Sequence, residues 1–256
     1  PILGAPMLSD WLPHRSYDSS TDIFYNAGSI GFIVEAAPMV GANERTGALW
    51  SQLLSDTIPS GCEFQALYAQ SPSVGPKITD WILPRLLAKG VFARAAEHRA
   101  RWLRRGVWES LSKDAPFFLR QHRVFISIAA PINSSIDVHV LNTVREALLT
   151  TLDALGMPAR KVTPVEFIGL INELLSPSTD NADKPSDYNT LDPIAPQCVR
   201  RDLETNISEH RIICQSNRFR PTGEKVDGVP VIGEVIPDKF DLRFFSVRNF
   251  PPRFAP

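Results

Sequence analysis

Two glycine-containing stretches have residue types that are found in phosphate-binding loops. Nucleotide hydrolysis needs a nest of backbone amides followed by a lysine and a metal-binding hydroxyl, in the order G-x-x-x-x-G-K-[ST]. Gly223-Glu224-Lys225 lacks the earlier glycine and the Ser or Thr that should follow. Gly28-Ser29-Ile30-Gly31 is not G-x-G-x-x-G, and a turn explains it. Because the Walker A motif is specific, its absence predicts that this chain is not an ATPase and binds no nucleotide cofactor.

Cysteine, histidine and paired acids offer a second kind of chemistry, nucleophilic or acid–base catalysis. A nucleophile would need a base beside it. The candidates are Cys62, Cys198 and Cys214 with His98, His122, His139 or His210, and none lies in a recognisable local signature. The paired acids are Asp18 with Asp22 and Asp80 with Glu97, and Asp18 is better explained as a turn former. We predict no catalytic residue and no metal site. The alternative is a stand-alone hydrolase with an unrecognised site around His122 or Cys198.

The clearest local charge anomaly is a basic run with helical periodicity. Its members are Arg85, Lys89, Arg94, Arg99, Arg101, Arg104 and Arg105, offset only by Glu97. The residues expected to share one helix face are Arg94, His98, Arg101 and Arg105. The plain interpretation is a solvated face whose arginine stems cover apolar surface. The sharper hypothesis is a contact with an acidic partner segment or anionic lipid headgroups, with Arg94, Arg101, Arg104 and Arg105 as candidates.

Nucleic acid is a third option for the basic helix 94–105. Few aromatic side chains that bases stack on are interleaved with the arginines, which weakens this option. Core packing is the default for a tryptophan, but Trp81 and Trp108 lie in a proline-rich middle region and are candidate interface anchors.

The bulk composition is that of a globular protein without a strong overall charge. The chain has 256 residues, of which 43% are hydrophobic and 21% charged, and its net charge is -1. Binding to nucleic acid or acidic lipid would therefore need a local patch. No apolar run approaches the ~18 residues of a membrane span. Three widely spaced cysteines without a C-x-x-C pair favour a reducing cytoplasm over a disulfide framework.

Apolar periodicity and turn residues predict the elements that position these groups. A hairpin is expected with a four-residue loop at 26–29, and Asn43 is expected to cap the next helix. Helices are expected at 49–58, 92–106, 136–155 and from 164 onward, strands at 64–69, 124–129, 212–214, 229–236 and 242–247, and a turn at 225–228. Helices between strands imply crossovers. We therefore predict an α+β (mixed α/β) fold whose sheet is mixed parallel and antiparallel, packed with helices, and has hairpins at both ends.

A polar stretch divides the chain. Residues 176–196 contain four prolines and show no periodicity. Such a loop is unusual inside a compact domain, so we predict two lobes within residues 1–256, an α/β lobe at 1–175 and a mainly β lobe at 197–256. The chain begins with Pro1 instead of Met, and it stops shortly after the run Phe250-Pro251-Pro252-Arg253-Phe254. We therefore expect it to be part of a longer protein.

Several blocks resemble the N-terminal region of the TraC-like ATPases of type IV secretion systems, the conjugative DNA-transfer motors. The first block runs from Leu12 to Glu44 and contains the expected hairpin. The other blocks are His122 to Ser127, Leu191-Asp192-Pro193 and Gln197-Cys198-Val199. They follow one another in the family's order, from Leu12 to about Val199, and the segment beyond them matches less clearly.

The resemblance implies a non-catalytic N-terminal assembly or docking domain of an ATPase that energises pilus assembly and DNA transfer across the cell envelope. It implies a cytoplasmic protein, peripheral to the bacterial inner membrane. The implied partners are inner-membrane secretion subunits and the protein's own motor domain, and we also expect a homo-oligomer and peripheral contact with anionic lipid. ATP and Mg would bind only in the motor domain outside these residues. A reading frame that continues past Pro256 into a phosphate-binding loop is the expected outcome of sequencing further.

Overall fold

The computed structural model describes residues 7–175 and 187–199, together with the backbone of five strands between residues 204 and 243. By its internal contacts the chain divides into two units, one of residues 17–163 and one of residues 1–16 with 164–256. The lobes predicted at 1–175 and 197–256 stay a prediction. Residues 176–186 of the expected linker lie outside the described residues, and its described end enters a short helix.

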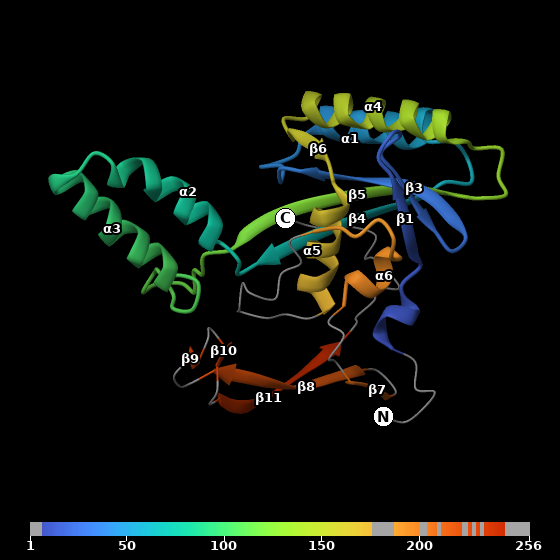
Figure 1. Ribbon diagram of the computed structural model, residues 1–256. Helices are drawn as coiled ribbons and strands as arrows, with labels where there is room; N and C mark the ends of the chain where they lie inside the picture. Colours follow the sequence, from blue (N-terminus) through green and yellow to red (C-terminus); the bar gives the residue numbers. More distant parts are fainter. Residues whose placement is uncertain are drawn as a thin grey trace. The chain divides into compact units, whose positions relative to one another are not determined.

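The unit of residues 17–163 is organised by a six-stranded sheet with the main order β1-β2-β3-β5-β4 (Figure 1). Its strands are β1 (His14–Asp18), β2 (Ile23–Asn26), β3 (Ser29–Ala36), β4 (Glu63–Ser71), β5 (Gln121–Pro131) and β6 (Ala159–Lys161), the last of which pairs with β3. The assigned registers between these strands are antiparallel. The α+β class is confirmed, whereas the expected parallel pairing is not found among the described registers.

The predicted opening hairpin is confirmed, with a shorter loop. β2 ends at Asn26 and β3 begins at Ser29, so two residues connect them, and Asn26 Nδ2 donates to Ser29 Oγ at 3.1 Å. In β3, Gly31 faces Ala129 of β5, and an added Cβ would lie 2.5 Å from the carbonyl oxygen of Ile128. A glycine is therefore required where these two backbones approach each other.

Two helices, α1 (Glu44–Gln52) and α4 (Val138–Ala154), cover one face of this sheet (Figure 1). Asn43 caps α1 as predicted, since its Oδ1 accepts from the Thr46 amide at 2.9 Å. A π-helical turn, η2 (Leu53–Thr57), extends α1 to the end that the sequence predicts. Asp137 caps α4 by accepting from the Val140 amide at 2.9 Å.

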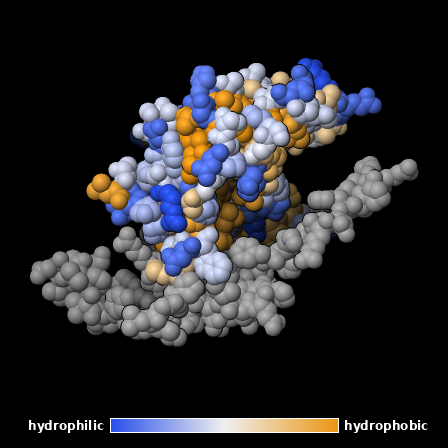
Figure 2. All heavy atoms as spheres, turned by 90° about the vertical axis from the view of Figure 1, so that its right-hand side faces the viewer, coloured by the Kyte–Doolittle hydropathy of each residue, from blue (hydrophilic) through white to orange (hydrophobic). Residues whose placement is uncertain are grey.

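The main core lies between α4 and the covered face of the sheet. Alternate residues of a strand point to one face, and helix residues three or four apart share a stripe. The buried positions that follow these spacings are Ile30, Phe32, Val34 and Ala36 in β3, Ile126, Ile128 and Ala130 in β5, and Leu141, Val144, Leu148 and Leu152 in α4. On the surface of the molecule, in contrast to this core, hydrophobic and hydrophilic residues lie side by side, as the face in Figure 2 shows.

A helical hairpin, α2 (Gly75–Leu86) and α3 (Gly90–Arg105), lies between β4 and β5 in the chain (Figure 1). The helix predicted at 92–106 is confirmed as α3. The sequence reasoning missed α2 because Pro76 and Pro84 suggested an irregular stretch. Pro76 lies in the first turn, where its missing N–H has no helical partner to lose, and Pro84 lies in the last turn.

The other unit contains η1 (Leu8–Trp11), α5 (Pro164–Leu175) and α6 (Ile194–Gln197), and α5 begins at the predicted residue. Its strands are β7 (Glu204–Ser208), β8 (Arg211–Pro221), β9 (Lys225–Val226), β10 (Val229–Pro230) and β11 (Gly233–Arg243). β7, β8 and β11 form an antiparallel sheet, and β9 pairs with β10 across the predicted turn. The strand expected at 242–247 extends past Arg243 outside the described residues.

Candidate functional site

The helical hairpin of α2 and α3 carries the basic run. Ser71 and Gln121 pair in register at the ends of β4 and β5, so the chain leaves the sheet and returns to it at adjacent positions. Ile78 and Ile82 of α2 share a buried cluster with Ala96 and Ala100 of α3. The small alanine side chains let the two helices approach closely. The hairpin therefore has a hydrophobic core of its own.

The segment after α3 closes the base of the hairpin with hydrogen bonds. The Leu119 amide donates to the Gly106 carbonyl at 2.7 Å, and Arg120 Nη1 donates to the Val107 carbonyl at 2.7 Å. An added Cβ at Gly106 would lie 2.6 Å from side-chain atoms of Leu111, so a larger residue here would require the Leu111 side chain to move. These contacts fix where α3 ends relative to its return segment.

The basic ridge comprises Arg94, Arg101, Arg104 and Arg105, which are all exposed. At 100° per residue, Arg94, Arg101 and Arg105 point away from the side on which Ala96 and Ala100 are buried. Arg105 Nε lies 3.2 Å from Glu109 Oε2, and both side chains are largely exposed. The side chains of Arg94, Arg101 and Arg104 form neither an ion pair nor a hydrogen bond with any residue that the structure describes.

Charge is concentrated on this hairpin. Residues 75–105 contain eight Lys and Arg against two acids, a net charge of +6, whereas the whole chain carries -1. Two of the arginines lie over tryptophans: the Arg85 guanidinium is 4.3 Å from the Trp81 ring centre and that of Arg99 is 4.4 Å from Trp102. Trp81 is thus packed within the hairpin. Trp108, the other candidate anchor, is 64% exposed just beyond the ridge.

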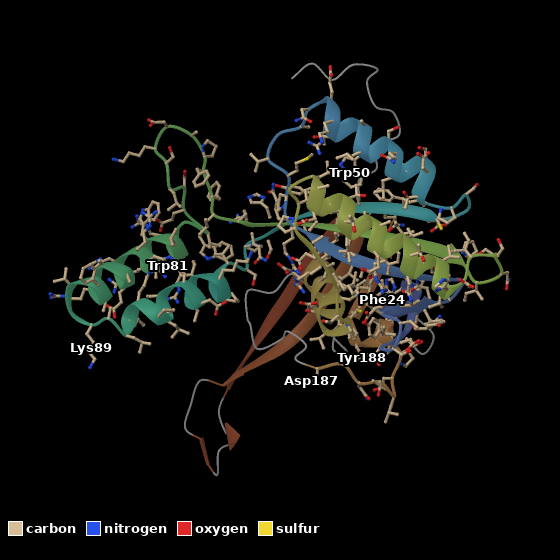
Figure 3. All side chains as sticks on the ribbon, turned by 90° about the horizontal axis from the view of Figure 1, so that it is seen from above. Phe24, Trp50, Trp81, Lys89, Asp187 and Tyr188 are labelled. Carbon is tan, nitrogen blue, oxygen red and sulfur yellow. The ribbon has the colours of Figure 1, made fainter. Side chains whose placement is uncertain are left out.

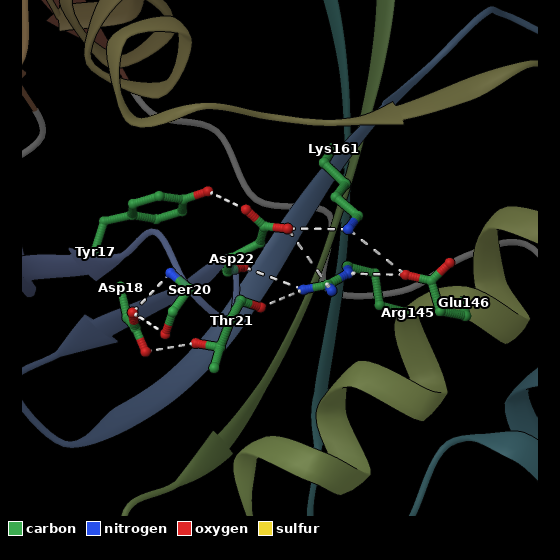
Figure 4. Close-up of polar contacts among 8 residues, drawn as sticks. All are labelled: Tyr17, Asp18, Ser20, Thr21, Asp22, Arg145, Glu146 and Lys161. Atoms are coloured by element: carbon green, nitrogen blue, oxygen red, sulfur yellow. Dashed lines mark hydrogen bonds and ion pairs between the residues drawn. The ribbon is translucent and has the colours of Figure 1, made fainter.

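A second polar cluster joins the turn after β1 to α4 and β6 (Figure 4). Asp22, which has a positive φ of 57°, accepts from Lys161 Nζ at 2.9 Å and from the Tyr17 hydroxyl at 2.7 Å. Arg145 is almost fully buried and donates its Nη1 to the carbonyl oxygens of Thr21 and Asp22 at 3.0 and 3.2 Å. The cluster therefore ties a strained turn to two elements that are distant in the sequence.

The electrostatics of this cluster indicate a structural role. The hydrogen bond from Lys161 is the main cause that lowers the pKa of Asp22, with Tyr17 adding to it. Burial, followed by the hydrogen bond to Asp22, raises the pKa of Tyr17, which keeps its hydroxyl protonated as a donor. Asp18 accepts from the Ser20 amide at 2.9 Å, which confirms it as a turn former. Asp22 thus lies beside the opposite charges of Lys161 and Arg145, at 2.9 and 4.0 Å, while the buried Arg145 Nε has no hydrogen-bond partner among the described residues.

The candidates for nucleophilic catalysis lie in separate surroundings. Cys198 is fully buried beyond α6, and burial raises its pKa to about 12, so the thiol stays protonated at neutral pH. Burial also raises the pKa of Cys62. His122 is exposed in β5, where its Nδ1 lies 2.6 Å from the Tyr68 hydroxyl. Cys214 and His210 have no described side chain.

The residues that the structure describes contain no group of three or more His, Cys, Asp or Glu residues arranged to hold a metal ion. In the same ranges, no helix combines the length and the hydropathy that a bilayer crossing requires.

Comparison with known proteins relates nearly the whole chain to one family. The family model described as TraC protein matches residues 8–256. Protein TraC of Escherichia coli (strain K12) is 24% identical over 211 residues, which cover 79% of this chain and 24% of that protein. The chain thus spans about a quarter of the length of this curated relative.

Proposed function

The chain belongs to the TraC protein family, and from this premise we propose that it is the non-catalytic N-terminal docking domain of a conjugative type IV secretion ATPase. The parent would energise pilus assembly and DNA transfer, and ATP and Mg would bind in its motor domain. The chain would lie in the cytoplasm, peripheral to the inner membrane, and transmit the motor's conformational changes to the channel. Its span of 24% of the curated relative supports assigning one domain's role to it.

The observation that carries the docking role is the uncompensated charge of the basic ridge. Three of its four arginines have no described ionic partner, and they lie on a helix held rigidly by the hairpin's own core. Arginine offers a planar set of donors that can bind a carboxylate through two bonds. An acidic segment of an inner-membrane channel subunit fits this chemistry. Trp108 lies next to the ridge in sequence and has the residue type that dominates the energy of many interfaces.

Charge reversal on the ridge tests the proposal. The test variant is Arg101→Glu/Arg104→Glu, because both side chains are exposed and unpaired among the described residues. The matched control is Arg45→Glu/Lys113→Glu, which changes the net charge equally at exposed positions outside helices α2 and α3. We expect the ridge variant, and not the control, to lose capture of co-expressed inner-membrane channel subunits. Equal capture by both variants, with an unchanged circular dichroism spectrum, would refute ridge docking.

Nucleic-acid binding is the second candidate, since the same net charge of +6 attracts phosphates. Titration of the chain with a DNA duplex at rising salt concentration distinguishes nucleic-acid binding from docking to a protein. Affinity that falls steeply with salt and disappears in the ridge variant would favour nucleic acid. The hydrolase alternative has less support, because burial keeps the Cys198 thiol protonated.

A further inference from the structure

The free end of the helical hairpin exposes large apolar side chains. Leu87 is 81% exposed, Val91 69% and Phe92 78%. They flank Lys89, which Figure 3 shows at the outer end of the hairpin, with its side chain directed away from the helices. We call Leu87, Val91 and Phe92 the apolar tip. Leu83 of α2 is 54% exposed as well, whereas the buried apolar groups of the hairpin lie in the cluster that α2 and α3 share.

The backbone of the connection holds these residues outward. Only residues 87–89 separate α2 from α3. Lys89 has a φ of 56° and Gly90 a φ of 63°, so two successive residues adopt a left-handed φ that reverses the chain sharply. Leu87 then lies just past the end of α2, and Val91 and Phe92 lie in the first turn of α3. The tip is a convex end with apolar residues on both sides of the turn.

Cations surround the apolar tip. Between Asp80 and Glu97 the chain contains Arg85, Lys89 and Arg94 and no acidic residue. Farther along α3, the exposed large side chains are charged or polar, while Trp102 and Leu103 are partly buried. In α3, apolar exposure is therefore confined to the first turn, and in α2 the exposed Leu83 lies one turn before Leu87. Positive charge borders this end of the hairpin.

We infer that this tip inserts into the headgroup region of an anionic lipid bilayer. This inference deepens the proposed function and rests on it for a site of action at the inner membrane. Interfacial segments bury apolar groups about 5–10 Å deep, and long basic side chains extend to the phosphates. Arg94 lies about 3 Å from Phe92 along the helix axis and Arg101 about 14 Å, at a rise of roughly 1.5 Å per residue. Lys89 and Arg94 would thus meet phosphates, whereas the Arg85 guanidinium is held over Trp81 and hydrogen-bonded to the Trp81 carbonyl. Arg101 and Arg104 would remain free for protein.

A fluid bilayer suits the tip better than a shaped protein pocket does. A convex end with apolar residues on both sides of a turn needs an apolar medium that conforms to it, whereas protein hot spots are buried in matching pockets. The surrounding cations also match the negative surface potential of a bilayer that contains anionic lipid. Both features therefore favour the same occupant.

Vesicle flotation tests the inference with the complete 256-residue chain. The probes are vesicles of phosphatidylcholine alone and of phosphatidylcholine mixed with phosphatidylglycerol. We expect binding to the mixed vesicles only. Leu87→Ser/Phe92→Ser should weaken this binding by at least about tenfold, because it removes two of the three inserted side chains. The control, Val40→Ser/Leu191→Ser, replaces equally exposed apolar residues and should bind like the original chain.

The outcomes separate this inference from the docking proposal. Absence of binding to mixed vesicles, or equal binding by the tip and control variants, would overturn the inference. So would a tip variant that floats normally but fails to capture channel subunits, since the tip would then contact protein. If the tip variant loses vesicle binding while the ridge variant captures subunits normally, lipid insertion stands and ridge docking fails.

Discussion

The sheet and the helical hairpin of the same unit use hydrophobic residues in opposite ways. Among the described residues, the sheet's cluster buries fifteen residues, whereas the hairpin's cluster buries six, two of them alanines. The sheet cluster keeps its large side chains inside, while the hairpin exposes Leu87, Val91 and Phe92 and carries the basic ridge. The sheet thus supplies most of the unit's stability, and the hairpin, which needs only enough core to stay rigid, presents contact surface.

The largest expected effect is a loss of stability in the sheet core. Ile128 is fully buried at the centre of β5, between Phe32 and Phe64 in register. Ile128→Ala should lower the free energy of unfolding by about 2–5 kcal/mol, because it removes apolar contact and leaves a cavity. Urea unfolding followed by circular dichroism measures this loss. Ile132→Ala, at a 51% exposed position, is the control and should change stability far less.

Overpacking of the hairpin should have a smaller and local effect. Ala100 is 1% exposed in the cluster shared with α2. Ala100→Leu should cost about 1–3 kcal/mol, because the added atoms force the helices apart. We expect faster amide hydrogen exchange in α2 and α3 and unchanged exchange in β3 and β5. Ala95→Leu, at an exposed position of the same helix, is the control. Equal acceleration in the sheet would show that the two regions are not separate.

Local periodicity predicts most of the architecture. A short run bounded by Gly61 and Pro72 identifies β4, and a continuous apolar run at Val124–Ala129 identifies β5. The apolar stripe from Ile136 to Leu155 identifies α4, because burial on one face of a helix repeats along the sequence. Helix α2 is not predicted in this way, because prolines in its first and last turns are residues that also occur commonly in loops. The three-residue strand β6 is too short to show a period and forms only by pairing with β3. The parallel pairing inferred from intervening helices does not appear among the described registers, since the α2–α3 hairpin returns beside its starting strand.

The candidate surface is only partly readable from sequence. The arginines of the basic ridge are visible as a charge run with helical spacing. The apolar tip is not, because Leu87, Val91 and Phe92 look like core residues until the turn at Lys89 places them at a free end. Arg145 is missed for another reason: the carbonyl of Thr21 that it binds is 124 residues away. Long-range contacts of this kind leave no local pattern.

The turn at Lys89 is a further difference between the hairpin and the sheet. The apolar tip is exposed at a turn whose backbone is strained. Lys89 has φ 56° and ψ 179°, a combination that residues other than glycine rarely adopt. Lys89→Gly should therefore raise the hairpin's local stability by on the order of 1 kcal/mol. Slower amide exchange in α2 and α3 would show this gain. Lys113→Gly, at an exposed position in the return segment, should not slow exchange. Faster exchange in Lys89→Gly would mean that chain flexibility outweighs the relief of strain.

The smallest expected effect concerns acid, and it should distinguish the two regions by their titration. The pKa of Asp22 is lowered, mainly by the hydrogen bond from Lys161, so its carboxylate stabilises the folded sheet above its ordinary pKa of about 3.9. This contribution, on the order of 1 kcal/mol or less for a partly exposed pair, is lost as the pH falls through the lowered pKa. Asp22→Asn should therefore be less stable than the original chain at pH 7, and the difference should shrink in urea titrations below about pH 4.

The control for this titration is Asp114→Asn, which removes an exposed carboxylate from the hairpin's return segment. The free energy of unfolding of this variant should differ little from that of the original chain at every pH. The hairpin's ridge contains no residue of the Asp22 cluster, so exchange in α2 and α3 should not follow the Asp22 transition. If acid loosens the hairpin before it loosens the turn held by Asp22, the division between a stabilising sheet and a contact-making hairpin is wrong, because the hairpin would then depend on carboxylates of its own, such as Glu109 beside Arg105.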